Sequence, residues 1–500
     1  MTIMDKEDIK NTKKKKKSKK VKRKINPILY KILSFIFIIL TVSTFTLLIY
    51  NGLFSLVELL TTIGISAVVV VLITLILCKS KLKQWIKNIV SIFTILIMIL
   101  EIFLIFFAPQ TLKFISSLTD TGYRVETFGV YVIKDEYNSL SDLKDKSIDT
   151  LKYDDDKNIN EVKSKIKKEI DYNTSEFDTI SDLLNSLNKE KSDAIILETS
   201  YEDIIKEEYP DLYGRLKRIY TTDVVNMIKT LKSDKDITKE PFLVYISGID
   251  TSGNVASSAR SDVNIILAVN PNTKKIVMVN TPRDYYITLH TKNKKDKLTH
   301  AGIYGVEESL KTLSDLYDEQ IDYYVRINFT SFVKIVDTLG GITVNVPGSF
   351  CEQDSKRSHA NEICLSKGTQ TLNGEQALAL ARNRHAFQEG DRARGEHQML
   401  ILEAIINKAL SPSVITKYSS ILNALKGRVT TNMTGNEMIN FAKKQIKDKS
   451  SYTFKSVSVT GKDSKGTCYS AGNATAYVME PDKDTVDNAI KEINSLVSGE

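Results

Sequence analysis

The stretch that decides the fold is Phe242-Leu-Val-Tyr-Ile-Ser-Gly-Ile-Asp250, an apolar and partly β-branched run that ends at a carboxylate. Two similar runs follow closely along the chain, Val263–Val269 and Lys275–Asn280. Short apolar runs of this kind, each bounded by polar residues, predict strands buried within a sheet. We therefore expect this part of the chain to be built around a sheet.

Helical patterns alternate with these strands. Amphipathic spacing and flanking turn residues predict helices at Val306–Tyr317, Phe329–Leu339, Gly374–Arg382 and Gly395–Leu410, and further strands at Ile342–Val346 and Tyr452–Val459. Asn373 stands where a residue would cap the third of these helices. The alternation predicts an α/β fold, in which helices pack on a mixed sheet in an αβα arrangement.

The distribution of arginine points to a ligand. Lysine is the default cation of this chain, with 56 lysines against 13 arginines, yet the segment from Ala381 to Gly395 has four arginines and no lysine. Those four, and two more near the predicted strand ends, are Arg382, Arg384, Arg392, Arg394, Arg260 and Arg283. Arginine grips phosphate with a planar fork of donors, whereas lysine offers a point charge. The pattern predicts a pyrophosphate site, while surface ion pairs would account for only one or two of these arginines.

Carboxylates accompany the arginines. Asp250 ends one predicted strand and Asp262 begins the next, and ligands of open α/β sheets collect at strand ends. Two carboxylates beside a pyrophosphate predict a site for Mg²⁺ (or Mn²⁺), which prefers oxygen ligands. For one aspartate alone, capping of a turn is the competing interpretation. Asp391 could accept a proton from an attacking hydroxyl, or hold the arginines by ion pairing.

A smaller α/β pattern precedes this region, from about residue 126 to residue 224. Its predicted elements are strands at Phe128–Ile133 and Asp193–Leu197 and helices at Ile159–Ile170, Thr179–Leu187 and Tyr201–Glu208. The charged segment Lys232–Lys239 is predicted to be the linker that follows it. The pattern contains no Gly-rich phosphate loop and no cluster of nucleophile and base, so its sequence alone assigns it no function.

Three apolar runs near the N-terminus predict membrane spans. Tyr30–Tyr50, Leu56–Cys78 and Ile89–Ala108 each reach the roughly 20 residues that a helix needs to cross a bilayer. The lysine-rich segment Lys79–Lys87 and the polybasic residues 1–28 should stay in the cytoplasm. Three spans then place everything after residue 108 outside the cell, in a multi-pass protein of the cell membrane. Glu101 lies inside the third run, where intramembrane charges are sometimes functional.

The charge of the chain divides in the same way. The net charge is +8, but residues 1–108 hold +12, so the remaining 392 residues hold −4. This division excludes a uniformly basic protein that coats nucleic acid, and no nucleic-acid partner is expected. The basic tail Lys13–Lys24 could bind anionic lipid or nucleic acid. An orientation signal is the favoured interpretation.

The cysteines leave one question open. Cys351 and Cys364 flank the polar stretch Glu352–Ile363, which is predicted to be a loop. Outside the cell a disulfide could close this loop, and two unpaired thiols are the alternative. No CxxC or clustered His/Cys spacing indicates zinc.

A series of short motifs in one order resembles the LytR-CpsA-Psr family. The motifs are Gly248-Ile-Asp250, Arg260-Ser-Asp262, Pro282-Arg-Asp284, Lys297-Leu-Thr-His300-Ala301, Ile321-Asp-Tyr-Tyr324, Asn328-Phe329, Leu339-Gly-Gly341, Leu372-Asn-Gly374, Ala381-Arg-Asn-Arg384 and Asp391-x-x-Arg394. The resemblance covers about residues 240–410, and the tail through residue 482 is expected to complete the domain. It implies a membrane-anchored transferase that moves a glycan, of capsule or teichoic-acid type, from a polyprenyl-pyrophosphate carrier to peptidoglycan.

The resemblance also implies roles for single residues. Asp250 and Asp262 would hold the metal, and the substrate pyrophosphate would be bound by Arg260, Arg283, Arg382, Arg384, Arg394 and Gln398. The catalytic residues would be Arg283, Arg382, Arg384, Asp391 and Arg394. The last motif departs from the family at Ala393, His397 and Met399. These differences would affect how the acceptor or the head group is recognised. The family also binds the lipid tail in an apolar pocket, whose residues periodicity cannot separate from ordinary core.

The expected organisation has four parts: a polybasic cytoplasmic tail at 1–28, three transmembrane helices at 29–108, an extracellular accessory α/β domain at 109–235, and the catalytic domain at 236–500. An accessory domain in this position resembles the capsule-attaching members of the family. Three functions compete with the transferase: a membrane-tethered transcriptional regulator, a hydrolase of lipid-linked pyrophosphate, and a glycan-lipid binding protein without turnover. Against the regulator, residues 1–28 show no helix-turn-helix pattern and no aromatic interleaving.

Overall fold

The computed structural model describes residues 27–499, except for 51–55, 80, 120–122, 154–155, 228–232, 250–254, 256, 356–361, 385, 388–389, 412–427, 449–450 and 473. Two predicted features, the basic tail and the candidate metal ligand Asp250, lie outside the described residues. The backbone of Asp391 is described, but its side chain is not. The chain divides into two compact units, Met1–Leu112 and Lys113–Glu500.

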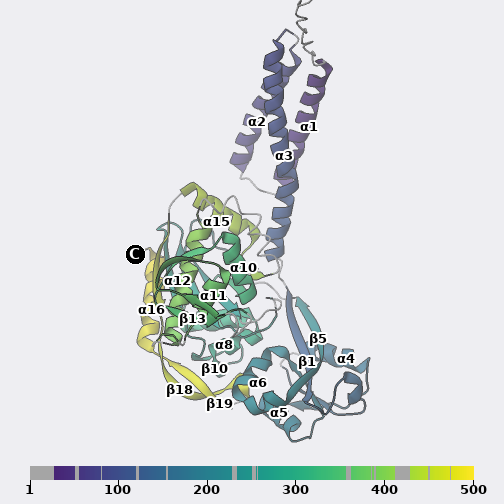
Figure 1. Cartoon of the computed structure of the whole chain (residues 1–500), viewed down its shortest axis with the longest axis vertical. Helices are drawn as coiled ribbons and strands as arrows, with labels where there is room; N and C mark the ends of the chain where they lie inside the picture. The colour runs from purple at the N-terminus through teal and green to yellow at the C-terminus, as the bar shows by residue number, and fades with distance from the viewer. Residues whose placement is uncertain are drawn as a thin grey trace, which may run out of the picture. The chain divides into compact units, whose positions relative to one another are not determined.

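The first unit consists of three apolar helices: α1 (Pro27–Tyr50), α2 (Leu56–Cys78) and α3 (Gln84–Thr119) (Figure 1). Each contains a segment long and apolar enough to cross a membrane. The hydroxyl of Thr41 donates a hydrogen bond of 2.7 Å to Glu101, so this carboxylate faces a neighbouring helix. Helix α3 is longer than the apolar run that predicted it. It begins before Ile89 and continues past Ala108, because the polar residues on either side of the run are helical as well.

A mixed six-stranded sheet forms the centre of the larger part of the second unit. Its strands, in spatial order, are β16 (Val429–Thr431), β11 (Tyr323–Asn328), β6 (Phe242–Ile249), β7 (Val263–Asn270), β8 (Lys275–Asn280) and β17 (Thr453–Ser458). The pairs β11–β6 and β17–β8 are parallel, and the other pairs are antiparallel. The predicted mixed sheet is therefore present, with β6 and β8 at the predicted residues.

Helices cover both faces of this sheet. On one face, α9 (Val306–Tyr317) and α16 (Lys483–Ser498) pack on buried residues such as Tyr245 and Ile266. On the other face, α12 (Asp391–Ala409) and α15 (Gly435–Asp448) pack on residues such as Leu267 and Met278. This is the predicted αβα arrangement. Helix α12 begins four residues before the predicted start, because its first turn is charged and carries no apolar pattern.

A group of shorter elements lies beyond β11. It comprises α10 (Phe329–Leu339), β12 (Ile342–Val346), β13 (Phe350–Gln353), β14 (Glu362–Leu365), β15 (Gly368–Leu372) and α11 (Gly374–Arg382). As predicted, Asn373 caps α11, and its side chain accepts a hydrogen bond of 2.9 Å from the backbone of Gln376. Buried residues of α10, α11, α12 and β12 share one core, which fixes the end of α11 relative to the sheet.

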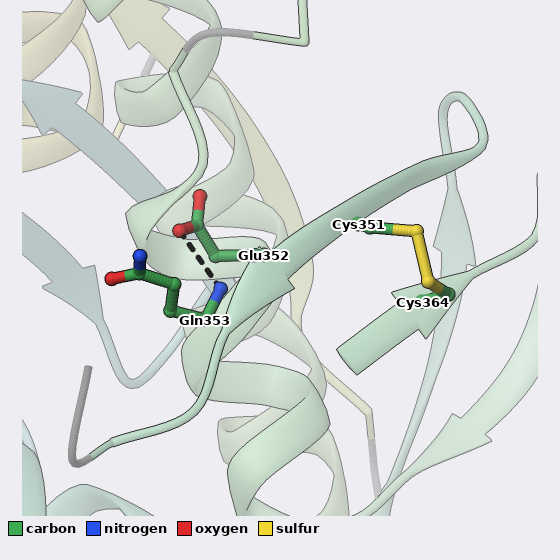
Figure 2. Close-up of a disulfide and its surroundings, with 4 residues drawn as sticks. All are labelled: Cys351, Glu352, Gln353 and Cys364. Atoms are coloured by element: carbon green, nitrogen blue, oxygen red, sulfur yellow. Dashed lines mark hydrogen bonds between the residues drawn. A yellow bond between two sulfur atoms is a disulfide. The ribbon is translucent and has the colours of Figure 1, made fainter. Parts of the chain in front are cut away.

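The cysteine pair is bonded. Cys351 and Cys364 stand directly opposite each other on β13 and β14, with a Cα–Cα distance of 4.0 Å, and form a disulfide (Figure 2). The prediction of a loop over Glu352–Ile363 was wrong at both ends, because Glu352, Gln353, Glu362 and Ile363 are strand residues. The two strands of this short ribbon could not be predicted from an apolar run, because most of their residues are polar and at least partly exposed.

The small α/β part (Tyr123–Met227) has a five-stranded sheet of its own. The strands, in spatial order, are β3 (Glu176–Phe177), β2 (Ile148–Leu151), β4 (Ala194–Glu198), β1 (Tyr123–Ile133) and β5 (Leu216–Met227). One face is packed by α4 (Lys157–Lys167) and the other by α5 (Ile180–Asn188) and α6 (Glu202–Glu208). The short helix α7 (Pro210–Arg215) follows α6. Strand β5 escaped the sequence analysis because polar residues interrupt it throughout.

The small α/β part shares a hydrophobic core with the larger part. The hairpin of β18 (Gly461–Cys468) and β19 (Ala474–Pro481) reaches the small part beside α5 and α6 (Figure 1). Cys468, Ala476 and Val478 of the hairpin belong to the same buried cluster as Leu183 and Ile204. Near them lie β9 (Tyr286–Thr288), β10 (Lys295–Lys297), α8 (Leu298–Ala301) and the 3-10 turn Gly302–Tyr304. This shared core therefore fixes the small part and the β18–β19 hairpin relative to each other.

Candidate functional site

The predicted strand ends meet at one edge of the six-stranded sheet. The amide of Asp262 donates to the carbonyl of Gly248 at 2.8 Å, which joins the start of β7 to the end of β6. The amide of Thr299, in α8, donates to the carbonyl of Arg283 at 2.8 Å. These two backbone hydrogen bonds hold Asp262 and Arg283 next to each other at the strand ends. Gly302 lies so close to the backbone before Arg260 that a Cβ atom there would be 2.5 Å from the carbonyl oxygen of Ala259.

Asp262 and Arg283 form the central ion pair. Nη1 of Arg283 donates to Oδ1 of Asp262 at 2.9 Å, and the hydroxyl of Thr299 donates to the same oxygen at 3.3 Å. Burial would raise the pKa of Asp262, but Arg283, Arg260 and Arg394 outweigh it and hold that pKa below its usual value. The site therefore keeps an ionised carboxylate among guanidinium groups.

The second group of arginines comes from the end of α11 and the start of α12. The guanidinium of Arg382 lies over the ring of Phe329, 5.5 Å from its centre, and donates to the carbonyl of Asp354 at 3.3 Å. The amide of Gln398 donates to the carbonyl of Ala381 at 3.2 Å, which ties α12 to α11. Stacking on an aromatic face orients the fork of Arg382 in a way that a lysine could not reproduce.

One pocket brings the two groups together. Among the predicted site residues, it is lined by Arg260, Asp262, Arg283, Arg382, Arg384, Arg394 and Gln398. Arg392 is different: it is exposed and pairs with Glu396 at 3.7 Å on the surface of α12, as the ion-pair interpretation predicted for some of these arginines. Nε and Nη1 of Arg260 and Nε of Arg283 are buried donors without a well-aligned hydrogen bond among the described residues, although carboxylates lie 3.6, 2.6 and 3.5 Å from them. Such donors suit an anion with several oxygens.

Other residues of this pocket escaped the sequence analysis. Asp203, Lys206 and Glu207 come from α6 of the small part, and Glu352 and Gln353 from the disulfide-linked ribbon (Figure 2). No pattern in the sequence connects α6 with the arginines, which follow it by some fifty to two hundred residues. The signal for the ribbon was the cysteine pair, which predicted a closed segment without indicating which side chains it would present.

An apolar cavity adjoins the arginine pocket. It lies between the sheet and the helices α10, α11 and α12 and is lined by Ile246, Gly248, Val263, Ile265, Ile327, Asn328, Phe329, Phe332, Leu378, Ala381, Gln398, Ile401, Leu402 and Ile405. Val263, Phe329, Ala381 and Gln398 line both the cavity and the arginine pocket. A ligand with a charged head and an apolar tail could therefore occupy both at once.

The residues that are described fit a hard divalent cation in part. Both hydrogen bonds to Asp262 go to Oδ1, and no described residue donates to Oδ2, which is left to accept a cation. The surrounding guanidinium groups would repel a free cation, but they would not repel one that arrives with a phosphate group. Asp262 therefore suits Mg²⁺ as a ligand shared with pyrophosphate, whereas the predicted second ligand, Asp250, lies outside the described residues.

A second cluster of possible metal ligands is structural. Asp296, His300 and Cys468 are buried together, with Nδ1 of His300 2.6 Å from Asp296. Asp296 also accepts a hydrogen bond of 2.7 Å from the backbone of Ser470. Burial raises the pKa of Cys468 to about 12, so the group is a thiol in this environment. We assign this cluster to joining α8 and the β18–β19 hairpin.

Known proteins resemble part of this chain. The LytR_cpsA_psr family model matches residues 216–492. A polyisoprenyl-teichoic acid–peptidoglycan teichoic acid transferase, TagU of Bacillus licheniformis, is 36% identical over 216 residues, which are 43% of this chain and 67% of the relative. TagT of Bacillus subtilis, a transferase of the same description, is 36% identical over 211 residues, or 41% of this chain and 64% of the relative.

Solved structures also match. The crystal structure of Bacillus subtilis TagV is 30% identical, and the match covers 52% of this chain and 98% of that one, with a TM-score of 0.43. A structure of TagT bound to LI-WTA is 28% identical, with coverage of 54% and 94% and a TM-score of 0.42. The match to the family model includes every residue that lines the apolar cavity, and every residue that lines the arginine pocket except Asp203, Lys206 and Glu207.

Proposed function

Because the chain belongs to the LytR-CpsA-Psr family, we propose that it is a membrane-anchored phosphotransferase that moves a glycan from a polyprenyl-pyrophosphate carrier to peptidoglycan. The observation that carries this proposal is the union of an arginine pocket with an apolar cavity. The two share Val263, Phe329, Ala381 and Gln398. A polyprenyl pyrophosphate has the same division, with an anionic head joined directly to an apolar chain.

The head group would lie among the arginines. Arg260, Arg283, Arg382, Arg384 and Arg394 would surround the two phosphoryl groups, and the guanidinium donors of Arg260 and Arg283 would bind their oxygens. In phosphoryl transfer the enzyme acts mainly by positioning and by stabilising charge on the phosphoryl oxygens. Five arginines in one pocket supply the positive charge that stabilises these oxygens, and the reaction needs no nucleophile from the protein.

The reaction itself exchanges one phosphorus–oxygen bond for another. A hydroxyl of the acceptor glycan would attack the phosphorus nearest the donor glycan and form a phosphodiester. The bond from that phosphorus to the bridging oxygen breaks, and polyprenyl phosphate leaves with the electron pair. The proton of the hydroxyl would pass to a carboxylate, for which the sequence suggests Asp391. No ATP is required, because the pyrophosphate of the carrier is already activated.

A divalent metal is part of the proposal. Asp262, with Asp250 as the second ligand suggested by the sequence, would hold Mg²⁺ (or Mn²⁺). When bound, the ion would neutralise charge on the pyrophosphate as a Lewis acid. Arg283 would keep Asp262 ionised and in place, since it holds Oδ1 and leaves Oδ2 to the metal.

The membrane anchor and the identity of the polymer are proposed from the apolar helices and from the names of the relatives. Three helices long enough to cross a membrane support an anchor near the N-terminus, and the lysine-rich flanks support a cytoplasmic N-terminus with residues after 108 outside. The small part would be an accessory domain at 109–235 and the larger part the catalytic domain at 236–500. The relatives with teichoic acid in their names favour a teichoic-acid donor, and a capsule glycan is the second candidate.

The test uses the full chain in lipid nanodiscs. It is incubated with a lipid-pyrophosphate-linked sugar, Mg²⁺ and peptidoglycan oligomers, and the oligomers are examined by mass spectrometry. We expect sugar phosphate covalently attached to the oligomers, together with stoichiometric polyprenyl phosphate. Release of free sugar phosphate alone would overturn the transferase and establish the hydrolase. Binding of the lipid without any turnover would establish the glycan-lipid binding protein instead.

A further inference from the structure

The small α/β part contributes one wall of the arginine pocket. Asp203 and Glu207 are four residues apart on the short helix α6, so they lie on one face of it, and Lys206 lies beside them. All three line the pocket. The pocket is thus built from two parts of the chain that have separate sheets.

The carboxylate of Glu207 lies between two of the pocket arginines. Its Oε2 is 2.6 Å from Nη1 of Arg260, and its Oε1 is 3.8 Å from Nη2 of Arg283. Burial would raise the pKa of Glu207, but Arg260 and Arg283 lower it below its usual value, so the group is a carboxylate. One side chain therefore supplies counter-charge to both arginines that stand at the strand ends.

Arg260 depends on α6 for its ion pairs. Within the described residues, its guanidinium pairs with Glu207 and, at 3.6 Å from Nε, with Asp203. Arg283 differs, because Asp262 at 2.9 Å and Asp284 at 3.5 Å also hold it. Five arginines in one pocket repel each other, and removing Glu207 would leave Arg260 with the more distant ion pair to Asp203 and the charge of Asp262.

Glu207 holds Arg260 by a close ion pair and Arg283 by a more distant one. Although Oε2 of Glu207 is close to Nη1 of Arg260, that donor and Nε make no hydrogen bond of good geometry among the described residues. The same is true of Nε of Arg283. Charge thus holds the guanidinium groups in place, and phosphoryl oxygens would share their donors with Glu207. Preorganised donors of this kind need no rearrangement when charge develops in the transition state.

Helix α6 is itself firmly attached to the larger part. Nζ of Lys297 is 3.0 Å from Glu208, and both side chains are largely buried. The hydroxyl of Tyr209 donates to the carbonyl of Ala471 at 2.8 Å. Ile204 and Ile205 are fully buried in the core that the two parts share. The position of Glu207 is therefore set by packing on both sides of the junction.

From this geometry we infer that Glu207 is a positioning residue of the active site, so that the small part takes a direct role in the transfer reaction. Glu207 holds Arg260 and Arg283 at the separation that the pyrophosphate requires. The inference rests on the proposed function for its kinetic consequences. Glu207 also places a negative charge in an anion pocket, so its loss should affect catalysis and substrate binding in opposite directions.

The kinetic test compares Glu207→Gln, Glu207→Asp and the control Glu202→Gln in the full chain. Glu202 lies on the same helix but pairs with Arg218 at 3.0 Å, within the small part. Since a small misplacement of catalytic groups can cost about 100-fold, we expect Glu207→Gln to lower kcat by about 10- to 100-fold while KM for the lipid-linked donor stays the same or falls. Glu207→Asp should recover part of kcat, and Glu202→Gln should match the wild type.

Two kinetic outcomes would overturn the inference. A lower KM with unchanged kcat would mean that Glu207 only competes with the substrate anion. Equal losses of activity and thermal stability in Glu207→Gln, without recovery in Glu207→Asp, would mean a purely structural role.

A structural measurement separates this inference from the proposed function. In a crystal structure of the Glu207→Gln chain, the guanidinium of Arg260 should leave its place, and an unmoved Arg260 would overturn the positioning role. If the wild-type chain transfers no glycan, the proposed function fails, but the displacement of Arg260 still reports on Glu207.

Discussion

Nη1 of Arg283 donates a hydrogen bond of 2.9 Å to Oδ1 of Asp262, and the hydroxyl of Thr299 approaches the same oxygen. One side of the carboxylate is thereby occupied, while Oδ2 receives no hydrogen bond from the described residues. The pair also lowers the pKa of Asp262, so the carboxylate stays charged well below neutral pH. One contact thus joins the arginine that we propose binds the pyrophosphate to the carboxylate that we propose holds the metal.

Asp262→Asn should abolish most of the activity. The amide cannot hold a divalent cation well and leaves Arg283 without its closest partner, so we expect a fall in kcat of about 100-fold or more, the scale of losing a transition-state contact. The rate measured against Mg²⁺ concentration should lose its saturation. The matched control is Asp284→Asn, because Asp284 contacts the same arginine at 3.5 Å and does not line the pocket. Equal losses in both variants would contradict a metal role for Asp262.

Arg382→Lys should keep the charge yet lose most of the transfer activity. The lysine would lose both the stacking on Phe329 and the bidentate fork. We expect a fall in kcat/KM of about 100-fold, typical of a lost oxyanion contact, measured with the lipid-linked donor. Arg392→Lys makes the same change at an exposed arginine outside the pocket and should be nearly silent. Near wild-type activity of Arg382→Lys would contradict the pyrophosphate site.

Leu402→Phe should discriminate between donors by the length of their lipid. Leu402 lines the apolar cavity, and a larger side chain would shorten the space for a polyprenyl chain. We expect KM to rise about tenfold or more for a long-chain donor, since each buried methylene contributes about 0.8 kcal/mol, and to change little for a short-chain one. Leu410→Phe, at the end of the same helix and outside the cavity lining, is the control. A rise in KM that is independent of chain length would count against lipid binding in this cavity.

Removing the disulfide should weaken the fold and the pocket together. Cys351 and Cys364 are separated by 13 residues, and closing a loop of this size contributes about 3 kcal/mol to the free energy of unfolding. The ribbon also holds Glu352, which accepts a hydrogen bond of 3.0 Å from Asn383 beside Arg382. We expect Cys351→Ser/Cys364→Ser to lower both the melting temperature and kcat. Reductant should reproduce the effect in the wild type and have none in the double variant.

The small part should lose stability as the pH rises. Burial and the neighbouring Glu126 raise the pKa of Glu198 from 4.5 to about 8. Between these values the folded chain binds more protons than the unfolded chain, so this contribution is complete below about pH 4.5 and is lost as pH rises through about 8. The melting temperature of Glu198→Gln minus that of the wild type should therefore increase with pH over this range. Glu136→Gln, at an exposed position, should show no such trend, and a constant difference for Glu198→Gln would contradict the raised pKa.

The central sheet could be predicted because burial dictates its sequence. Strand β6 and the helices α9, α10 and α11 have the predicted bounds, since each carries a clear apolar pattern. The edge strand β5 and the ribbon β13–β14 could not be predicted in this way. Their exposed side chains carry no such pattern, and pairing with a neighbouring strand decides their conformation.

The site followed from residue chemistry more than from pattern. The bias toward arginine identified Arg382, Arg384 and Arg394, and the strand ends identified Asp262 and Arg283, all of which line one pocket. The bias also included Arg392, which lies outside that pocket, because composition does not distinguish the faces of a helix. The apolar cavity and the contribution of α6 depend on tertiary packing, which leaves no local signal in the sequence.

The shared core between the small part and the β18–β19 hairpin limits how this protein can be recombined with its relatives. Cys468, Ala476 and Val478 of the hairpin pack in the same buried core as the apolar residues of α5 and α6. A graft of the small part alone onto a protein without this hairpin would leave an apolar face open and would misplace Glu207. A chimera with such a protein must therefore take the hairpin along with the small part, so that the exchangeable module is discontinuous in the chain.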